Sequence, residues 1–173
     1  MSTLSLFDAL SAHGGTVAEL LDRTRASSDG DPGPPQLAAT GPRTAGRAEE
    51  YELLLEMILE GARLHYGPQR IVRTEDPDLA LLVGDQLYAL GLARLAAIGD
   101  MDAVSELADV ISLVAQAHAT ADSELAAAVW EAGAAAVGWG ASDEHVKAKQ
   151  MARGGSAGAA AALREAADIV QSS

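Results

Sequence analysis

The acidic residues ahead of the longest apolar segment are the first candidates for chemistry in this sequence. Glu75, Asp76 and Asp78 lie close enough together for their carboxylates to share a hard cation such as Mg²⁺. Pro77 interrupts the cluster, and an Asp followed by Pro and a second Asp is also the pattern of a helix start. Helix capping accounts for every residue of the cluster, so we expect no metal there.

The histidines and serines offer no catalytic set. His118 lacks the Glu-x-x-His companion of carboxylate-bridged metal bundles, and we expect it at a helix C-terminus, where a positive charge suits the dipole. His13, His65 and His145 are scattered, and no serine has a histidine or nucleophile-elbow context. Cysteine is absent, which removes thiolate chemistry and disulfides and fits a reducing compartment. We expect a cytoplasmic protein without a cofactor and without activity of its own.

Two further acidic residues, Glu106 and Asp109, share one side of a predicted helix at i, i+3 spacing. The apolar residues of that helix lie on its other side. Like-charged pairs are common on the polar faces of helices, so we expect both carboxylates to be solvated.

The apolar segment from Leu79 to Ile98 contains a carboxylate and two glycines. Asp85 has apolar neighbours, and a buried charge is costly without a partner. We therefore expect a buried carboxylate satisfied inside the protein or at an interface. Gly84 and Gly91 each cost about 1 kcal/mol of helix propensity, so we expect a close helix neighbour, in this chain or in another.

This segment is also long enough to span a membrane. Its polar residues favour instead the buried central helix of a soluble protein, and we expect no membrane span. The formal net charge of −13 would repel a phosphate backbone and an anionic membrane surface. Nucleic acid is therefore not an expected partner.

Composition favours an all-α fold. The 173 residues are 49% hydrophobic but only 3% aromatic, so the core must be built mainly from Ala, Leu, Val and Ile. Helical spacing of these residues recurs along the chain, and no alternation typical of strands appears. Short connections between the predicted helices favour an antiparallel helical bundle.

The sequence divides into two parts. Residues 27–46 contain four of the six prolines and no apolar period, which is typical of a flexible or disordered linker. Before it, Thr16 and Glu19 could form the capping box of a short helix. We therefore assign residues 1–46 to a short helical segment and linker, and residues 47–173 to the bundle.

Residues that typically start or end helices mark the helix boundaries within the bundle. A first helix ends at Gly67, and the next runs from an Asp76 cap to Gly99. The expected starts of the four later helices are Asp100, Asp122, Ser142 and Ser156.

One stretch of the chain resembles the trans-polyprenyl diphosphate synthases. The sequence LVGDQLYA at 82–89 is similar to the Gly-Asp helix of that family, with Tyr88 in place of a leucine, and ISLVAQAHA at 111–119 resembles its next helix. The segment EGARLHYGPQR at 60–70 is only faintly similar to the family's diphosphate-binding region and lacks its Gly-Gly-Lys-Arg core. The resemblance covers roughly residues 50–120 and implies an isoprenoid-synthase-like bundle in part.

The departures from that family define the predicted role. The paired DDxxD motifs that hold Mg²⁺ in its enzymes are missing, and the chain is shorter than they are. The resemblance therefore implies a non-catalytic subunit that pairs with a catalytic synthase in isoprenoid biosynthesis, with Gly84, Asp85, Tyr88 and Gly91 at the interface. The alternative is a stand-alone helical module that forms homo-oligomers without prenyl chemistry. A third possibility is a carrier of a small apolar ligand held between helices.

Overall fold

The computed structural model describes residues 3–22, 24 and 33–172, and confirms an all-α helical bundle. The part of the chain that the structure describes contains no β-strand, only an isolated bridge between Leu21 and Val72. Among the described residues, nine α-helices and the short 3₁₀ helix η2 follow one another in the order α1 (Thr3–His13), α2 (Gly15–Glu19), α3 (Pro34–Ala39), η2 (Ala45–Arg47), α4 (Ala48–Tyr66), α5 (Pro77–Ile98), α6 (Met101–Ala119), α7 (Ser123–Trp139), α8 (Asp143–Arg153) and α9 (Ala159–Gln171).

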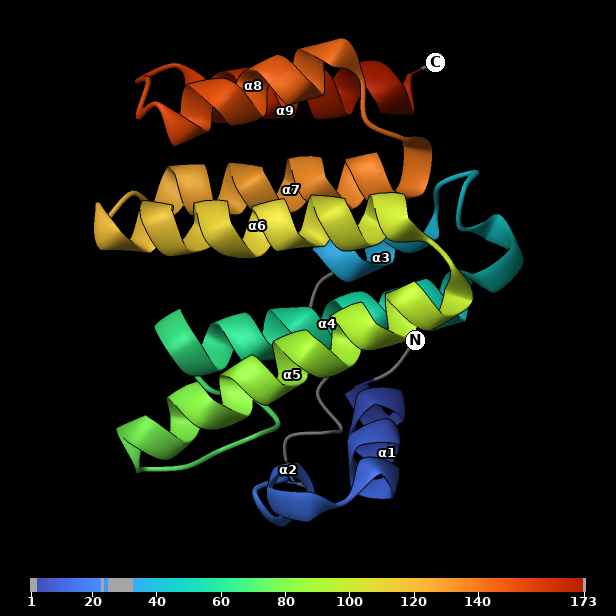
Figure 1. Ribbon diagram of the computed structural model, residues 1–173, viewed down its shortest axis with the longest axis vertical. Helices are drawn as coiled ribbons and strands as arrows, with labels where there is room; N and C mark the ends of the chain where they lie inside the picture. Colours follow the sequence, from blue (N-terminus) through green and yellow to red (C-terminus); the bar gives the residue numbers. More distant parts are fainter. Residues whose placement is uncertain (1–2, 23, 25–32, 173) are drawn as a thin grey trace.

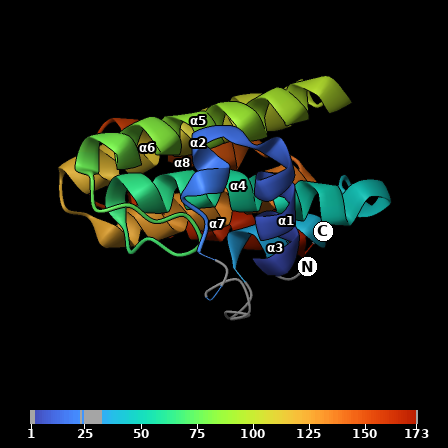
Figure 2. The ribbon, with the colours of Figure 1, turned by 90° about the horizontal axis from the view of Figure 1, so that it is seen from below.

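The helices stack in tiers along the longest axis of the molecule (Figure 1). The α8–α9 pair lies at one end, followed by α6 and α7, then by α4 and α5, with α1 and α2 at the other end. The short α3 packs between α4 and α7 and so joins the two middle tiers. Figure 2 shows that α5 lies on an outer side of the molecule and not at its centre.

Four of the predicted helix starts are confirmed in atomic detail. The Asp76 carboxylate accepts hydrogen bonds from the backbone N–H groups of Asp78 and Leu79, and Pro77 occupies the first helical position. The side chains at 100, 122 and 142 cap α6, α7 and α8 in the same way. These caps satisfy N–H groups that have no partner within the helix.

Two other predicted starts are wrong in detail. The α9 helix begins after Gly158, since residues 156–158 form a turn without a side-chain cap. Thr16 lies inside α2, whose N-cap is Gly14 at a φ of 78°, so the predicted capping box does not form.

The prediction of a linker over 27–46 is wrong for its second part. Residues 25–32 lie outside the described residues, but 33–46 fold as α3 and η2 and pack on the bundle. Gly33 and Pro34 begin α3, and the Gln36 side chain accepts a hydrogen bond from the Gly33 N–H. Gly41 then lies so close to Gly138 of α7 that a β-carbon would overlap its backbone. This close approach packs the apolar helix α3 against α7, and the tertiary contact stabilises the folded form of residues 33–46.

Candidate functional site

The inner face of α5 packs tightly on α4 through its glycines. A β-carbon added at Gly84 would lie 2.6 Å from Cδ2 of His65, and one added at Gly91 would lie 2.5 Å from Cγ1 of Ile58. Gly61 of α4 makes a matching approach to the backbone of α5. The predicted close neighbour of this glycine surface is therefore a helix of the same chain.

Asp85 differs from the expectation of a buried carboxylate. Its side chain is 71% exposed, and its Oδ1 lies 3.1 Å from Nε2 of His65. The two atoms do not have hydrogen-bond geometry because of the orientation of the imidazole ring. The buried Nε2 therefore has no hydrogen-bond partner among the described residues. Tyr88 stacks on the His65 ring with centroids 5.2 Å apart. Burial, followed by the nearby Tyr66 and Asp85, raises the pKa of Tyr88, so its phenol is neutral.

The opposite side of α5 is apolar and open to solvent; we call it the outer face of α5. Leu81 and Leu82 are 47% and 65% exposed, and the alanines that follow them on this side are exposed as well. Asp85 supplies the charge in the middle of the face. The outer face consists of Leu81, Leu82, Ala89, Ala93, Ala96 and Ala97.

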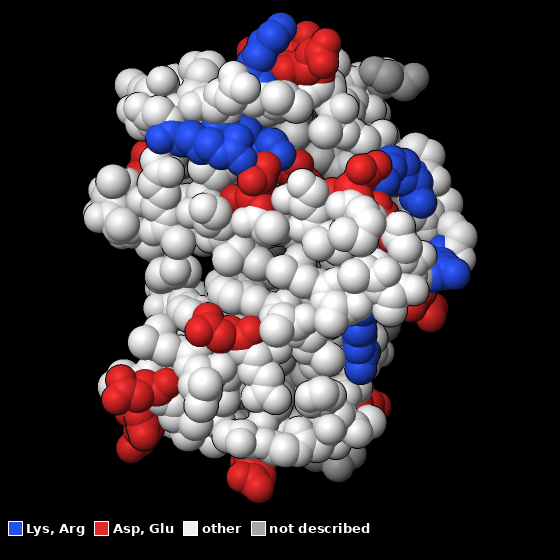
Figure 3. Space-filling view, in the orientation of Figure 1, with Lys and Arg blue, Asp and Glu red and all other residues white. Residues whose placement is uncertain are grey.

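The expectation of a buried central helix is therefore wrong for α5. Only 33% of its most apolar 18-residue window is buried, because α4 and α6 cover one side alone. By length and composition α5 could cross a membrane, and no other helix in the described part of the chain could. Figure 3 shows the surface over α5 as largely uncharged, with a dense group of charges where α6 meets α8.

That group of charges corrects a second expectation. Glu106 is 7% exposed rather than solvated, and its carboxylate lies 2.7 Å from Nε2 of His145 and 2.5 Å from Nζ of Lys149. The same Lys149 ammonium lies 2.8 Å from Asp109, which also pairs with Arg153. Charged residues of α6 thus bind basic residues of α8 across a mostly buried contact.

The ion pairs between α6 and α8 change how their groups titrate. Burial would raise the pKa of Asp109, but hydrogen bonds and charges from Lys149 and Arg153 outweigh it, so this pKa is lowered. Burial would lower the pKa of Lys149, but its two carboxylate partners raise it. Both groups therefore remain charged at neutral pH.

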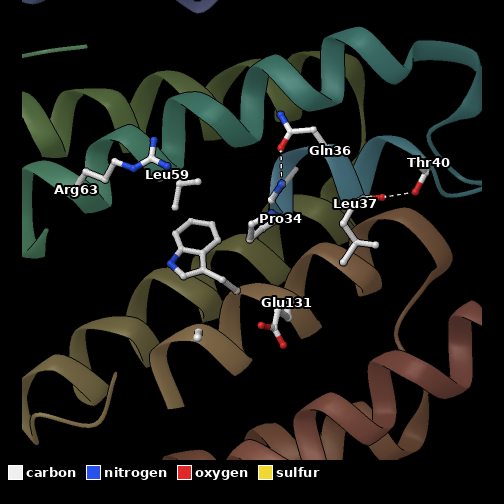
Figure 4. Close-up of a pocket in the computed structure, with 10 residues that line it drawn as sticks. Pro34, Gln36, Leu37, Thr40, Leu59, Arg63 and Glu131 are labelled. Atoms are coloured by element: carbon white, nitrogen blue, oxygen red, sulfur yellow. Dashed lines mark hydrogen bonds between the residues drawn. The ribbon is translucent and has the colours of Figure 1, made fainter. Parts of the chain in front are cut away.

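A cavity of about 700 Å³ opens between α3, α4 and α7 (Figure 4). Its wall is mainly apolar, and Arg63 and Leu59 reach it from α4 while Glu131 reaches it from α7. Trp130, which is 8% exposed, adds an aromatic surface. The residues that define it are Pro34, Leu37, Leu59, Arg63, Trp130 and Glu131.

A buried carboxylate beside this cavity holds one of its walls in place. Glu60 is 0% exposed and accepts hydrogen bonds from the N–H groups of Ile71 and Val72 at 2.6 and 3.1 Å. It also lies 3.2 Å from Nη1 of Arg63 and 3.3 Å from Nε of Arg70. These partners satisfy the buried charge and fix the Arg63 guanidinium.

No residue set for metal-dependent chemistry is visible among the described residues. Within residues 3–22, 24 and 33–172, no three His, Asp or Glu side chains lie together in a way that could hold a metal ion. The carboxylate of Asp76 caps α5, as predicted. The expectation that the chain alone is not an enzyme stays a prediction.

Comparisons of the chain with protein-family models, with curated proteins and with solved structures find no match. The likeness to the trans-polyprenyl diphosphate synthases therefore rests on the sequence resemblance of residues 82–89 and 111–119 described above.

Two features escaped the sequence analysis although signals for them existed. The order Gly33, Pro34, Pro35, Gln36 is a helix start with proline at the first position, and it was obscured by the other prolines and glycines nearby. Trp130 is a bulky side chain in a helix of alanines, a pattern that indicates uneven packing and here marks the cavity.

Proposed function

We propose that this protein is a helical interaction module that pairs with a second copy of itself through the outer face of α5. The observation that carries the proposal is the exposure of Leu81 and Leu82 beside a row of exposed alanines on one apolar helix. Exposed apolar surface of this kind marks interaction sites on soluble proteins.

The order of residues on this face is self-complementary about Ala89. Leu82 and Ala96 lie at equal distances from Ala89 along the helix, and so do Leu81 and Ala97. In an antiparallel pair with its two-fold axis at Ala89, each leucine therefore meets an alanine of the second copy. Large residues then pack on small ones, as close helix packing requires, and both copies use the same surface.

The charges on the face are compatible with this pairing. Asp85 meets the position of Ala93 in the second copy, so no two acidic groups oppose each other. The two Asp85 residues would be separated along the axis by about 12 Å at a rise of 1.5 Å per residue, which exceeds the Debye length of about 8 Å at physiological salt. Their repulsion would be largely screened.

The absence of cysteine in the chain allows a direct test of the pairing. We expect Ala89→Cys to form a disulfide dimer under mild oxidation, because residue 89 faces its own copy at the two-fold axis. Ala161→Cys, at an exposed alanine of α9, is the matched control and should stay monomeric. A mixture of Leu82→Cys and Ala96→Cys should cross-link to each other in preference to themselves.

Two other outcomes would overturn self-pairing. If Ala89→Cys and Ala161→Cys behave alike and the chain floats with phosphatidylcholine vesicles, the outer face of α5 binds a membrane instead. If the chain purified from its native host carries a stoichiometric companion with two DDxxD motifs, its partner is a catalytic trans-polyprenyl diphosphate synthase. That second outcome is the role implied by the resemblance of residues 82–89, and it would use the same helix.

A further inference from the structure

The cavity between α3, α4 and α7 has the size and lining of a small-molecule site. Its volume of about 700 Å³ lies within the range of roughly 300–1,000 Å³ that is usual for ligand pockets. Leu37, Leu59 and Trp130 provide an apolar wall, and Ala127 is exposed at its edge. An apolar molecule of moderate size would remove this surface from water.

Most polar groups around the cavity are already engaged within the protein. The Gln36 amide bonds to the Gly33 N–H and to the carboxylates of Glu52 and Glu56. The Thr40 hydroxyl donates to the Leu37 carbonyl, and Glu131 pairs with Arg164. These groups therefore hold the wall in place and are not available to a ligand.

Arg63 is the exception. Its Nη1 contacts Glu60, but its Nε and Nη2 have no hydrogen-bond partner in the described part of the chain. These two N–H groups form one edge of the guanidinium, which matches the two oxygens of a carboxylate. The neighbouring carboxylates of Glu56 and Glu60 are also paired with Arg70, at 2.6 and 3.3 Å.

We propose that this cavity binds a small apolar carboxylic acid. The apolar body lies against Trp130, Leu37 and Leu59, and the carboxylate accepts hydrogen bonds from the free edge of Arg63. The site lies away from the outer face of α5, so this proposal stands or falls independently of the pairing proposed above.

Decanoate and decanol are matched probes, since they share an apolar body and differ in the charged end. Binding to the full chain is measured by calorimetry at neutral pH below the micelle concentration. We expect saturable binding of decanoate and at least tenfold weaker binding of decanol. Arg63→Gln should weaken decanoate binding at least tenfold and leave decanol unchanged, whereas Arg47→Gln, at an exposed arginine, should change neither.

A second variant tests the position of the ligand. Ala127→Phe fills the cavity from an exposed position, so folding is retained while the binding of both probes should be lost. The proposal is overturned if wild-type protein shows no saturable decanoate binding, or if Ala127→Phe binds decanoate as well as the wild type does.

Discussion

Helices α5 and α6 lie on the same side of the molecule (Figure 1), but their surfaces differ in composition and in what covers them. The side of α6 that faces α8 is charged, and His145 and Lys149 of α8 cover it at Glu106. The outer face of α5 is built from leucine and alanine, and no element in the described part of the chain covers it. The comparison indicates that ion pairs hold α8 on α6 within the chain, while the apolar outer face of α5 is available to a partner molecule.

The largest expected effect is on the charged contact. Lys149→Ala leaves Glu106 and Asp109 without their shared cation in a mostly buried site. Removing one partner of a buried ion pair typically costs about 3–5 kcal/mol. Urea unfolding should show a loss of this size, whereas Lys147→Ala, at an exposed lysine of the same helix, should change stability little. If the two variants are equally stable, the ion pairs between α6 and α8 do not stabilise the fold.

The next largest effect is expected on the outer face of α5. Leu82→Glu introduces a carboxylate into each half of the proposed pair, and we expect the dissociation constant to rise at least 100-fold, about 2.7 kcal/mol. The stability of the monomer should not change, because Leu82 is 65% exposed. Val146→Glu, at an exposed apolar residue of α8, is the control that should not affect association. Size-exclusion chromatography with light scattering measures both.

The inner face of α5 should respond to added volume. Gly91→Ala places a β-carbon 2.5 Å from Cγ1 of Ile58, and overpacking of this kind costs about 1–3 kcal/mol. Gly46→Ala is a suitable control, because a β-carbon there meets no atom within 4 Å. If thermal melts of the two variants agree, the contact between α4 and α5 is looser than described.

The smallest expected effect is the pH dependence of the charged contact. The pKa of Asp109 is lowered in the folded state, so its contribution is present above its ordinary pKa of about 3.9 and is lost as pH falls through the lowered value. Asp109→Asn should therefore flatten the loss of stability as pH falls below about 3.9, and Asp168→Asn, at an exposed residue of α9, is the control variant. Urea midpoints measured across this range decide between them.

At alkaline pH the dependence of stability on pH has the opposite sign, so stability falls as pH rises. Burial and the hydrogen bond to Asp100 raise the pKa of Tyr51 to about 12, and the pKa of Lys149 is raised as well. A raised pKa contributes stability below the ordinary value of about 10 that is lost as pH rises further. We expect stability to fall above about pH 10, and Tyr51→Phe to lessen that fall in urea titrations. An unchanged alkaline limb in this variant would contradict the assignment.

Local signals predicted the helices from α4 to α8 well, while α1 and α3 were not predicted and tertiary contacts decided the rest. Asp76 caps α5 as expected, since the cap involves neighbouring residues alone. The burial of Glu106 depends on Lys149, which lies far along the chain, and no local sequence pattern predicts that pairing. The exposure of Asp85 was missed because α5 is apolar on both sides, so its periodicity does not distinguish the side that α4 covers.

The most direct test of the central claim is sedimentation equilibrium of the unmodified chain at physiological salt over a wide range of concentrations. The proposed pairing predicts a reversible approach to twice the chain mass of 17.7 kDa. A mass that stays at 17.7 kDa up to the solubility limit would contradict it, and the outer face of α5 would then have to serve a different partner.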